Sequence, residues 1–345
     1  MNSVKIAGKG TVQIKYAKTD IKLGSPGDMI IRMKACGICG SDLEKVFGEY
    51  GMSSGKLGHE PSGEVLSVGK NVKDFKIGDR VFVHHHVGCH NCHFCKHGNF
   101  TMCQQYQQSN FQPCGLSDIF LVPEWNVSKG GVLKLPDTMS YEQASLIEPL
   151  ACCIRAINKV KSYKGDDVAV FGAGPAGLML VMLAKLHGFD KIFLLDFNSF
   201  RLEFSKRNIE GITPVNLKNG FEEIIRSNTE NRGVDLSIVA TSSLNALSNA
   251  FEITRKGGTI LQFGVPGKNS SFEFDIAKIY SNELTFLSSY AASEIETHQA
   301  LNLLQEKTVD LDFLVTHKFK LQDSQNAFDC AHKAADCMKV IITSD

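Results

Sequence analysis

The hydrophobic positions of this chain follow one pattern in the first 140 residues and another in the middle. In the first part, short alternating or continuous apolar runs such as 29–33 and 63–68 are separated by Gly and Pro. Runs of this length, bounded by turn residues, are typical of β-strands. We therefore predict a barrel-like β-domain over this part of the chain.

Between about residues 149 and 291, apolar strands alternate with helical segments, the first of which is the apolar-rich helix 178–187. This alternation is typical of a parallel sheet covered by helices. The tail contains a predicted helix at 296–305 and a closing strand at 338–342, which suggests that it returns to the first domain. The strands predicted in the middle segment are 167–171, 191–195, 234–241, 258–264 and 285–290.

A glycine-rich loop joins the first of these strands to its helix, and Asp196 ends the next strand. In this context Gly172 permits a tight turn, Gly174 lets a pyrophosphate approach the N–H groups of the helix, and Gly177 lets helix and sheet pack closely. The pattern predicts a dinucleotide site. Its loop residues are Gly172, Gly174, Pro175, Ala176 and Gly177.

Asp196 would accept hydrogen bonds from the ribose hydroxyls and repel a 2′-phosphate, so the sequence favours NAD over NADP. Arg201, one helical turn further on, is expected near the same ribose and leaves some tolerance for NADP. Two later strands end at Thr241 and at Gly264-Val265. Because parallel sheets bind ligands at the carboxyl ends of their strands, we predict that these residues also contact the cofactor.

Composition narrows the choice of function. The length of 345 residues suggests two domains, and equal numbers of basic and acidic residues, 37 each, argue against nucleic acid as a partner. No apolar run is long enough for a membrane span. The chain has 11 cysteines, and the sequence from Met1 onward does not read as a signal peptide. We therefore expect reduced thiols and bound metal rather than disulfides, and a cytoplasmic location.

Four cysteines in the segment 88–103 are spaced C-x2-C-x2-C-x7-C. Thiolates this close together can bind one tetrahedral Zn²⁺, which would order a loop that has little apolar periodicity. We predict a structural zinc here. An iron–sulfur cluster fits the spacing less well, and unrelated reduced thiols are the remaining alternative. The predicted ligands are Cys89, Cys92, Cys95 and Cys103.

A second metal site is predicted around Cys39, which lies in a glycine-flanked polar turn. His59, with Glu60 beside it, and Glu148 are the other candidate ligands. Cys39, His59 and one of the two glutamates would form a three-ligand site with one position open for water or a substrate oxygen. We therefore predict a catalytic zinc, which makes two zinc ions per chain.

Taken together, these motifs resemble the zinc-containing medium-chain dehydrogenase/reductase family, in its alcohol, polyol, sorbitol and threonine dehydrogenase branch. The resemblance covers essentially the whole chain, since the motifs occur in the family's order. It implies a GroES-like β-barrel catalytic domain (1–148 and 292–345) with an inserted Rossmann domain (149–291) that has a doubly wound parallel sheet. The matching segments are 39–42, 58–60, 78–81, the four-cysteine lobe, 148–150, 172–177 with Asp196, and 256–258.

The resemblance also implies roles for single residues. Cys39 and His59 match catalytic zinc ligands, with Glu60 or Glu148 approaching the ion, and Asp42 matches the carboxylate that orients the ligand histidine. Ser41 matches the start of a proton relay, whose next position is Glu44 here instead of the histidine that family members often carry. His86 matches a histidine that threonine dehydrogenases place near their substrate. Family members form dimers or tetramers, so a homodimer or homotetramer is expected.

We therefore expect an enzyme that transfers a hydride from a secondary alcohol of a polyol, sugar or related small molecule to NAD. The alternatives are oxidation of L-threonine or another β-hydroxy amino acid at C3, and a non-catalytic zinc protein that binds NAD. A zinc-ribbon nucleic-acid binder lacks the required basic helix after the cysteines. Candidates for the substrate pocket are Phe47, Tyr50, Phe111 and Tyr290.

Overall fold

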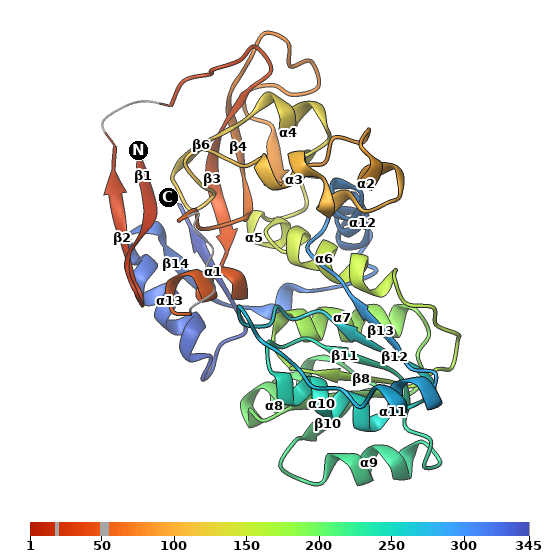
Figure 1. The fold of residues 1–345 in the computed structure, drawn as a ribbon. Coiled ribbons are helices and arrows are strands. Elements are labelled where there is room, and N and C mark those ends of the chain that lie inside the picture. The colour runs from red at the N-terminus through yellow and green to blue at the C-terminus, as the bar shows by residue number, and fades with distance from the viewer. Residues whose placement is uncertain (18–20, 49–54, 345) are drawn as a thin grey trace. The chain divides into compact units, whose positions relative to one another are not determined.

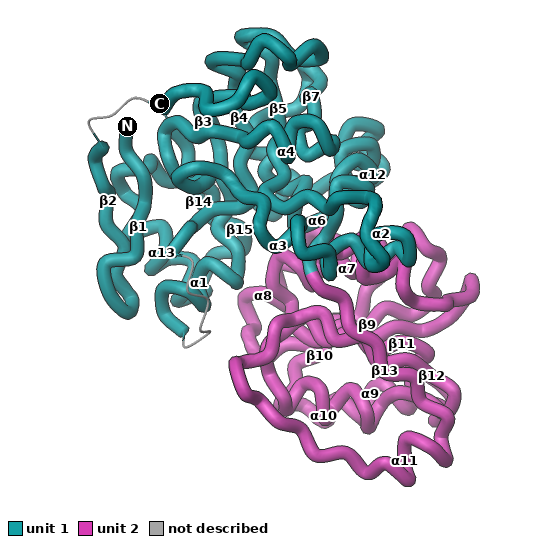
Figure 2. Tube along the Cα trace, turned by 45° about the horizontal axis from the view of Figure 1, so that its top comes forward, with its two compact units in different colours: residues 1–151, 291–345 teal, residues 152–290 magenta. Residues whose placement is uncertain are grey.

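The computed structural model describes residues 1–17, 21–48 and 55–344, so Tyr50 lies outside the described residues. The chain forms two compact units (Figure 2). Unit 1 consists of Met1–Ala151 and Ala291–Asp345, and unit 2 of Cys152–Tyr290. Unit 1 is thus made from both ends of the chain. Among the described residues, no helix is long and apolar enough to cross a membrane.

In the described part of unit 1, seven strands form the main sheet, in the order β14-β15-β3-β4-β5-β7, and β6 also pairs with β3 (Figure 1). The central strand β3 (Met29–Gly37) pairs antiparallel with β4 (Glu60–Val68) and with the C-terminal strand β15 (Lys339–Thr343). The C-terminal strand therefore lies within the sheet of the N-terminal segment. The other strands of unit 1 are β1 (Asn2–Gly8), β2 (Thr11–Tyr16), β5 (Arg80–Val83), β6 (Ile119–Val122), β7 (Val132–Lys134) and β14 (Val315–Lys320).

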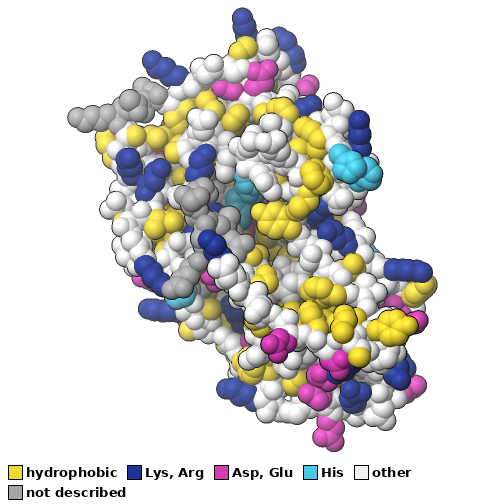
Figure 3. Space-filling model, in the orientation of Figure 1, with side chains coloured by type: hydrophobic (Ala, Val, Ile, Leu, Met, Phe, Trp, Pro, Cys, Tyr) yellow, Lys and Arg dark blue, Asp and Glu magenta, His cyan; other side chains and the backbone are white. Residues whose placement is uncertain are grey.

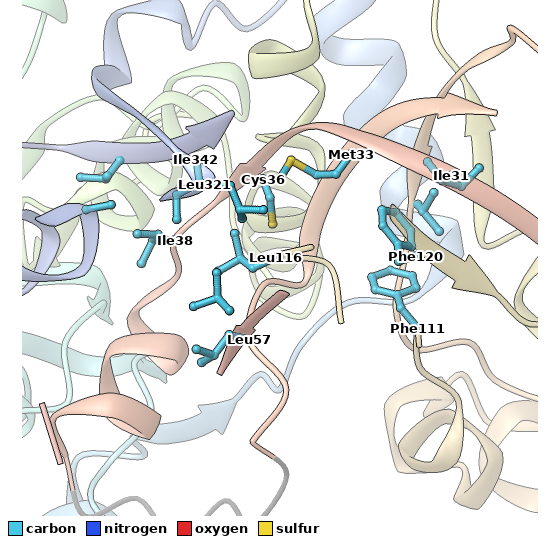
Figure 4. Packing of buried hydrophobic residues seen from close by; sticks show 14 of the residues in the cluster. Ile31, Met33, Cys36, Ile38, Leu57, Phe111, Leu116, Phe120, Leu321 and Ile342 are labelled. Atoms are coloured by element: carbon cyan, nitrogen blue, oxygen red, sulfur yellow. The ribbon is translucent and has the colours of Figure 1, made fainter. Parts of the chain in front are cut away.

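The core of unit 1 forms because apolar side chains of the sheet turn inward, as Ile31 and Met33 do on either side of the exposed Arg32. Figure 4 shows Phe111 against Phe120 in this core, with ring centroids 5.0 Å apart. Phe111, a candidate for the substrate pocket, is instead fully buried among core side chains. Burial of an aromatic side chain contributes about 1.5–3 kcal/mol.

Short helices and turns join the strands of unit 1. They begin at capping positions; Ser140, for example, caps α5 and receives the N–H of Gln143. The helices are α1 (Gly40–Val46), α2 (His93–Lys96), α3 (Gln104–Gln108), α4 (Glu124–Ser128), α5 (Tyr141–Ala144), α6 (Ile147–Ile157), which continues into unit 2, α12 (Glu294–Gln305) and α13 (Ser324–Lys333), with the 3-10 turns η1 (Phe100–Met102), η2 (Asp312–Leu314) and η3 (Leu321–Asp323).

Unit 2, which is described throughout, contains a parallel six-stranded sheet in the order β10-β9-β8-β11-β12-β13 (Figure 1). The chain starts in the centre at β8 and winds outward to both edges, as in doubly wound sheets. β8 is buried on both faces, which explains its continuous apolar run. The strands are β8 (Val168–Phe171), β9 (Ile192–Asp196), β10 (Thr213–Asn216), β11 (Val234–Val239), β12 (Thr254–Gln262) and β13 (Thr285–Ser288); the helices are α7 (Pro175–Leu186), α8 (Ser199–Asn208), α9 (Phe221–Asn228), α10 (Leu244–Ile253) and α11 (Ile276–Ser281).

The surface carries both signs of charge. Basic and acidic side chains are intermingled on the face shown in Figure 3, as expected from their equal numbers.

Candidate active site and metal centres

The register of β3 and β4 brings the residues of the first predicted metal site together. Gly37 at the end of β3 lies opposite Glu60 at the start of β4, so the chain after Gly37 runs beside the chain before Glu60. Cys39 and His59 lie on these extensions. The ligand atoms of Cys39, His59 and Glu60 all lie within 4.8 Å of one another. Thiolate, imidazole and carboxylate are the donors that zinc prefers, so this set fits the ion.

Asp42, on the first turn of α1, holds the two loops of this site. Its buried carboxylate lies 3.4 Å from Nδ1 of His59 and accepts the backbone N–H groups of Cys39 at 3.3 Å and Gly58 at 3.2 Å. Burial alone would raise the pKa of Asp42, but the facing His59 holds it well below its usual range. Because Nδ1 of His59 faces Asp42, Nε2 is left for a metal.

Glu60 has a second neighbour that the sequence analysis missed. Nζ of Lys339, at the start of β15, lies 2.7 Å from Oε1 and 2.6 Å from Oε2 of Glu60, and it donates to the Ile38 carbonyl at 3.1 Å. Both side chains are almost completely buried. Burial lowers the pKa of Lys339, but the Glu60 charge outweighs this and raises it. A single lysine opening an apolar closing strand was the only sequence signal for this pair.

Glu148, the other candidate for the third ligand, lies in the first turn of α6 and is buried. It is outside the cluster of Cys39, His59 and Glu60, although its charge acts on Lys339. Ser41 and Glu44 lie on α1. The Glu44 carboxylate folds back against Gly48.

The second predicted metal site is also assembled. The sulfur atoms of Cys89, Cys92, Cys95 and Cys103 lie within 4.8 Å of one another, and all 11 cysteines of the chain are free. Backbone N–H groups point at Cys89 Sγ from Asn91 (3.4 Å) and Cys92 (3.2 Å), which lowers the pKa of Cys89 to about 6. Four sulfurs around one point fit a tetrahedral zinc.

Three consecutive histidines after β5 lie beside the first site. His84 is fully buried, and its Nε2 faces the Ala292 carbonyl at 3.2 Å. The His85 ring is 5.1 Å from the His59 ring and 4.0 Å from the His86 ring. Burial, followed by the charge of His86, lowers the pKa of His85, and burial lowers that of His86 to about 4. His84 therefore belongs to the buried interior, whereas His85 and His86 are only partly buried.

In unit 2 the glycine-rich loop has the predicted form. Gly172 has φ +104°, and a Cβ on Gly177 would collide with the Gly172 carbonyl, so neither position tolerates a side chain. Asp196 accepts the N–H groups of Ala173 (2.7 Å) and Asn198 (2.8 Å), which fixes its carboxylate beside the loop. The helix α7 begins at Pro175, which has no backbone N–H, and an N–H at this first helical position would have no partner within the helix.

Arg201 and the later strand ends surround the same loop. A Cβ on Gly174 would lie 3.4 Å from Nη1 of Arg201, whose Nε is buried without a hydrogen-bond partner in the described chain. Gly264 packs against the backbone of Thr241, and Val265 next to it is exposed. A backbone cradle with an adjacent guanidinium fits a dinucleotide pyrophosphate.

Phe47 and Tyr290 are the other pocket candidates among the described residues. Phe47 stacks on His332 with ring centroids 3.9 Å apart, and Tyr290 is exposed.

Comparison with known proteins identifies the family. Residues 25–137 match the alcohol dehydrogenase GroES-like domain, and residues 175–306 match the zinc-binding dehydrogenase domain. The chain is 32% identical to sorbitol dehydrogenase of Bacillus subtilis over 339 residues, which are 96% of this chain and 94% of that protein. The chain belongs to the zinc-binding alcohol dehydrogenase family. The predicted resemblance and fold class, a Rossmann domain inserted into a GroES-like domain, are therefore confirmed.

Two further similar proteins support this family assignment. Probable D-xylulose reductase A of Neosartorya fischeri is 30% identical over 93% of this chain and 91% of that protein. The solved structure of alcohol dehydrogenase TADH from Thermus sp. ATN1 superposes with a TM-score of 0.87 at 28% identity, covering 100% of both chains. Membership in the family makes the chain an oxidoreductase that uses zinc and a nicotinamide cofactor, so the non-catalytic alternative is not retained.

Proposed function

We propose that this dehydrogenase oxidises a secondary alcohol of a polyol, sugar or related polar molecule with NAD as the hydride acceptor. The cluster of Cys39, His59 and Glu60 carries the proposal, because it places three zinc-type donors in one place, with the His85 ring beside them. The similarity to sorbitol dehydrogenase and D-xylulose reductase supports polyols as the substrate class.

When bound at this cluster, zinc would supply Lewis-acid stabilisation of an alkoxide, and NAD would accept the hydride. The residues of the chain would position the metal ligands and transfer the substrate proton. Asp42 keeps Nε2 of His59 turned to the metal position, and Lys339 holds Glu60 in place. Ser41, on the turn after Cys39, is the first acceptor for the substrate proton. The second relay step falls to Glu44 or to water.

The four-cysteine lobe is proposed to hold the second, structural zinc, with Cys89, Cys92, Cys95 and Cys103 as ligands. NAD is proposed to bind along the glycine-rich loop, with its ribose hydroxyls at Asp196. Each oxygen of this carboxylate already accepts one backbone N–H group, which fixes it, and each keeps a lone pair for a ribose hydroxyl. The residues proposed to contact the cofactor are Gly172, Gly174, Pro175, Ala176, Gly177, Asp196, Arg201, Thr241, Gly264 and Val265.

The deciding experiment combines a metal count with turnover. Zinc-loaded protein is assayed for NADH formation on polyols, aldoses, sugar phosphates, simple secondary alcohols and L-threonine, together with Cys39→Ser and the control Cys330→Ser. We expect two zinc ions in the wild type and the control, one in Cys39→Ser, and loss of turnover only in Cys39→Ser, with NAD binding retained. An active Cys39→Ser enzyme would refute the assignment.

His86 favours L-threonine or a related β-hydroxy amino acid as the second candidate substrate. Its ring lies 4.0 Å from that of His85, beside the cluster. Turnover of L-threonine above that of all polyols in the same panel would select this alternative.

We also propose a homodimer or homotetramer in a reducing, cytoplasmic environment. Exposed side chains lie on the edge strand β13, including Phe286, and Ile276 and Tyr280 on α11 are strongly exposed. Apolar side chains at an open sheet edge are typical of an interface. The free state of all cysteines supports the reducing location. Sedimentation of wild type and Phe286→Lys tests the assembly, since the charge should yield monomers.

A further inference from the structure

Two histidines lie one helical turn apart on the outside of the four-cysteine lobe. His93 begins the short helix α2, and His97 ends it four residues later. Side chains at this spacing lie on the same face of a helix. Both histidines are exposed, and their ring centroids lie 4.2 Å apart with the ring planes at 38° to each other. Neither the proposed catalytic site nor the four-cysteine site uses this pair.

The ring of His97 is held as the ring of a metal-binding histidine is held. Its Nδ1 lies 2.8 Å from the carbonyl oxygen of His93, which can only accept a hydrogen bond, so Nδ1 of the neutral ring carries the proton. The lone pair of the ring is then on Nε2. Metal-binding histidines almost always donate their other ring N–H in this way, which fixes both the tautomer and the orientation of the ring. Nε2 of His97 is therefore left for an ion at the surface.

The ring of His93 can supply the second donor. Its neighbours among the described rings are Phe94, at 5.9 Å, and His97, and neither of its nitrogens is hydrogen-bonded within the described chain. Two nitrogens that bind one zinc ion at about 2.0–2.1 Å lie about 3.3 Å apart at the tetrahedral angle. Rings with centroids 4.2 Å apart can present nitrogens at this separation. Because the pair is exposed, water would complete the coordination of the ion.

We propose that His93 and His97 form a third metal site of the chain, for an exchangeable divalent ion such as Cu²⁺, Ni²⁺ or Zn²⁺. Imidazole suits these ions, whereas Mg²⁺ and Ca²⁺ take oxygen ligands. With two protein ligands and water, the site binds its ion more weakly than four thiolates do. The ion would also stabilise α2, because it bridges the two ends of a helix that is too short to be stable alone. Cys92 precedes this helix and Cys95 lies within it, so the surface ion would support the backbone of the four-cysteine site.

The test uses Ni²⁺ as the probe, since it shares this ligand preference and can be counted separately from zinc. Zinc-loaded protein is dialysed against metal-free buffer to remove loosely bound zinc and then against micromolar Ni²⁺, and both metals are counted by plasma mass spectrometry. The lobe variants are His93→Asn and His97→Asn. The control is His187→Asn in unit 2. Nδ1 of this exposed histidine also lies 2.8 Å from a carbonyl four residues earlier, that of Leu183, but no described ring lies beside it.

We expect one Ni²⁺ per chain in the wild type and in the control. Each lobe variant should raise the Kd for Ni²⁺ at least about tenfold and keep the zinc content of the wild type. Stability gives a second readout, because an ion that binds only the folded lobe raises the Tm. Ni²⁺ should raise the Tm of the wild type and the control more than that of either lobe variant, and Mg²⁺ should give no such difference.

Three results would overturn the third site. The first is an equal affinity for Ni²⁺ in the wild type and both lobe variants, and the second is binding by the wild type only at millimolar Ni²⁺. The third is a loss of zinc from either lobe variant, because the histidines would then belong to the four-cysteine site. Nickel is counted without turnover, so an inactive enzyme with a normal third site would refute only the proposed function.

Discussion

Lys339→Met should destabilise unit 1, because it would leave the Glu60 carboxylate buried without its cation. Glu60 is completely buried and Lys339 is 4% exposed, so water cannot replace the lost partner. Removing one member of a buried ion pair typically costs about 3–5 kcal/mol. The lost bond from Lys339 to the Ile38 carbonyl contributes to the same total. With a urea m-value of about 2 kcal/mol/M, the midpoint of unfolding should fall by roughly 1.5–2.5 M.

The chain offers a specific probe for this measurement. Its single tryptophan, Trp125, lies on α4 in unit 1, so urea unfolding followed by tryptophan fluorescence reports on that unit. The double variant Glu60→Met/Lys339→Met should regain most of the loss, since an apolar pair leaves no uncompensated charge. The matched control is Lys318→Met, which removes the more exposed ion pair of Lys318 with Glu142. It should change the free energy of unfolding by less than about 1 kcal/mol. A Lys339→Met midpoint equal to that of the control, or a double variant less stable than either single one, would refute the reasoning.

Three further predictions concern the cofactor loop and the buried histidine. Asp196→Ala should raise the KM for NAD selectively and shift the NAD/NADP preference towards NADP; steady-state kinetics with both cofactors check this, and an unchanged ratio would contradict the role of Asp196. Gly177→Ala should cost about 1–3 kcal/mol and weaken NADH binding, because its Cβ collides with the Gly172 carbonyl. Gly8→Ala, where a Cβ meets no atom within 4 Å and φ is not positive, is the control and should leave NADH fluorescence titrations unchanged. Burial lowers the pKa of His84 to about 3, so below pH 6.5 the unfolded chain binds a proton that the folded chain does not. The free energy of unfolding should therefore fall by up to ~1.4 kcal/mol per pH unit towards pH 3. His84→Gln should reduce that slope, as measured by urea unfolding at pH 7, 6 and 5.

Local patterns were sufficient where neighbours in sequence are neighbours in space. The glycine-rich loop is such a case, since strand, turn and helix follow one another and Asp196 ends the adjacent strand, one helix later. The four-cysteine lobe is another, because 15 residues contain all four sulfurs. In both places the physical requirement, a backbone cradle or four soft donors, can be read from residue type and spacing alone.

Long-range contacts were not accessible in this way. Lys339 reaches Glu60 across 279 positions of sequence, through the pairing of β15 with β3. Nothing in the residues around Glu60 indicates that its carboxylate has a buried cation. The His84 and His86 rings likewise make their hydrogen bonds with the carbonyls of Ala292 and Ser109, which no local pattern connects to them.

The contacts of Lys339 bear on which glutamate would complete the catalytic metal site. Glu60 has the position, since it lies within 4.8 Å of the Cys39 and His59 donors, but Lys339 contacts both of its oxygens. Glu148 lies outside that cluster, yet its charge also acts on Lys339. Lys339 therefore contacts one candidate carboxylate directly and lies within the electrostatic influence of the other. We expect a movement of Glu60 towards a metal to weaken its contact with Lys339, so the choice of the third ligand should depend on this lysine as well as on the distance to the metal position.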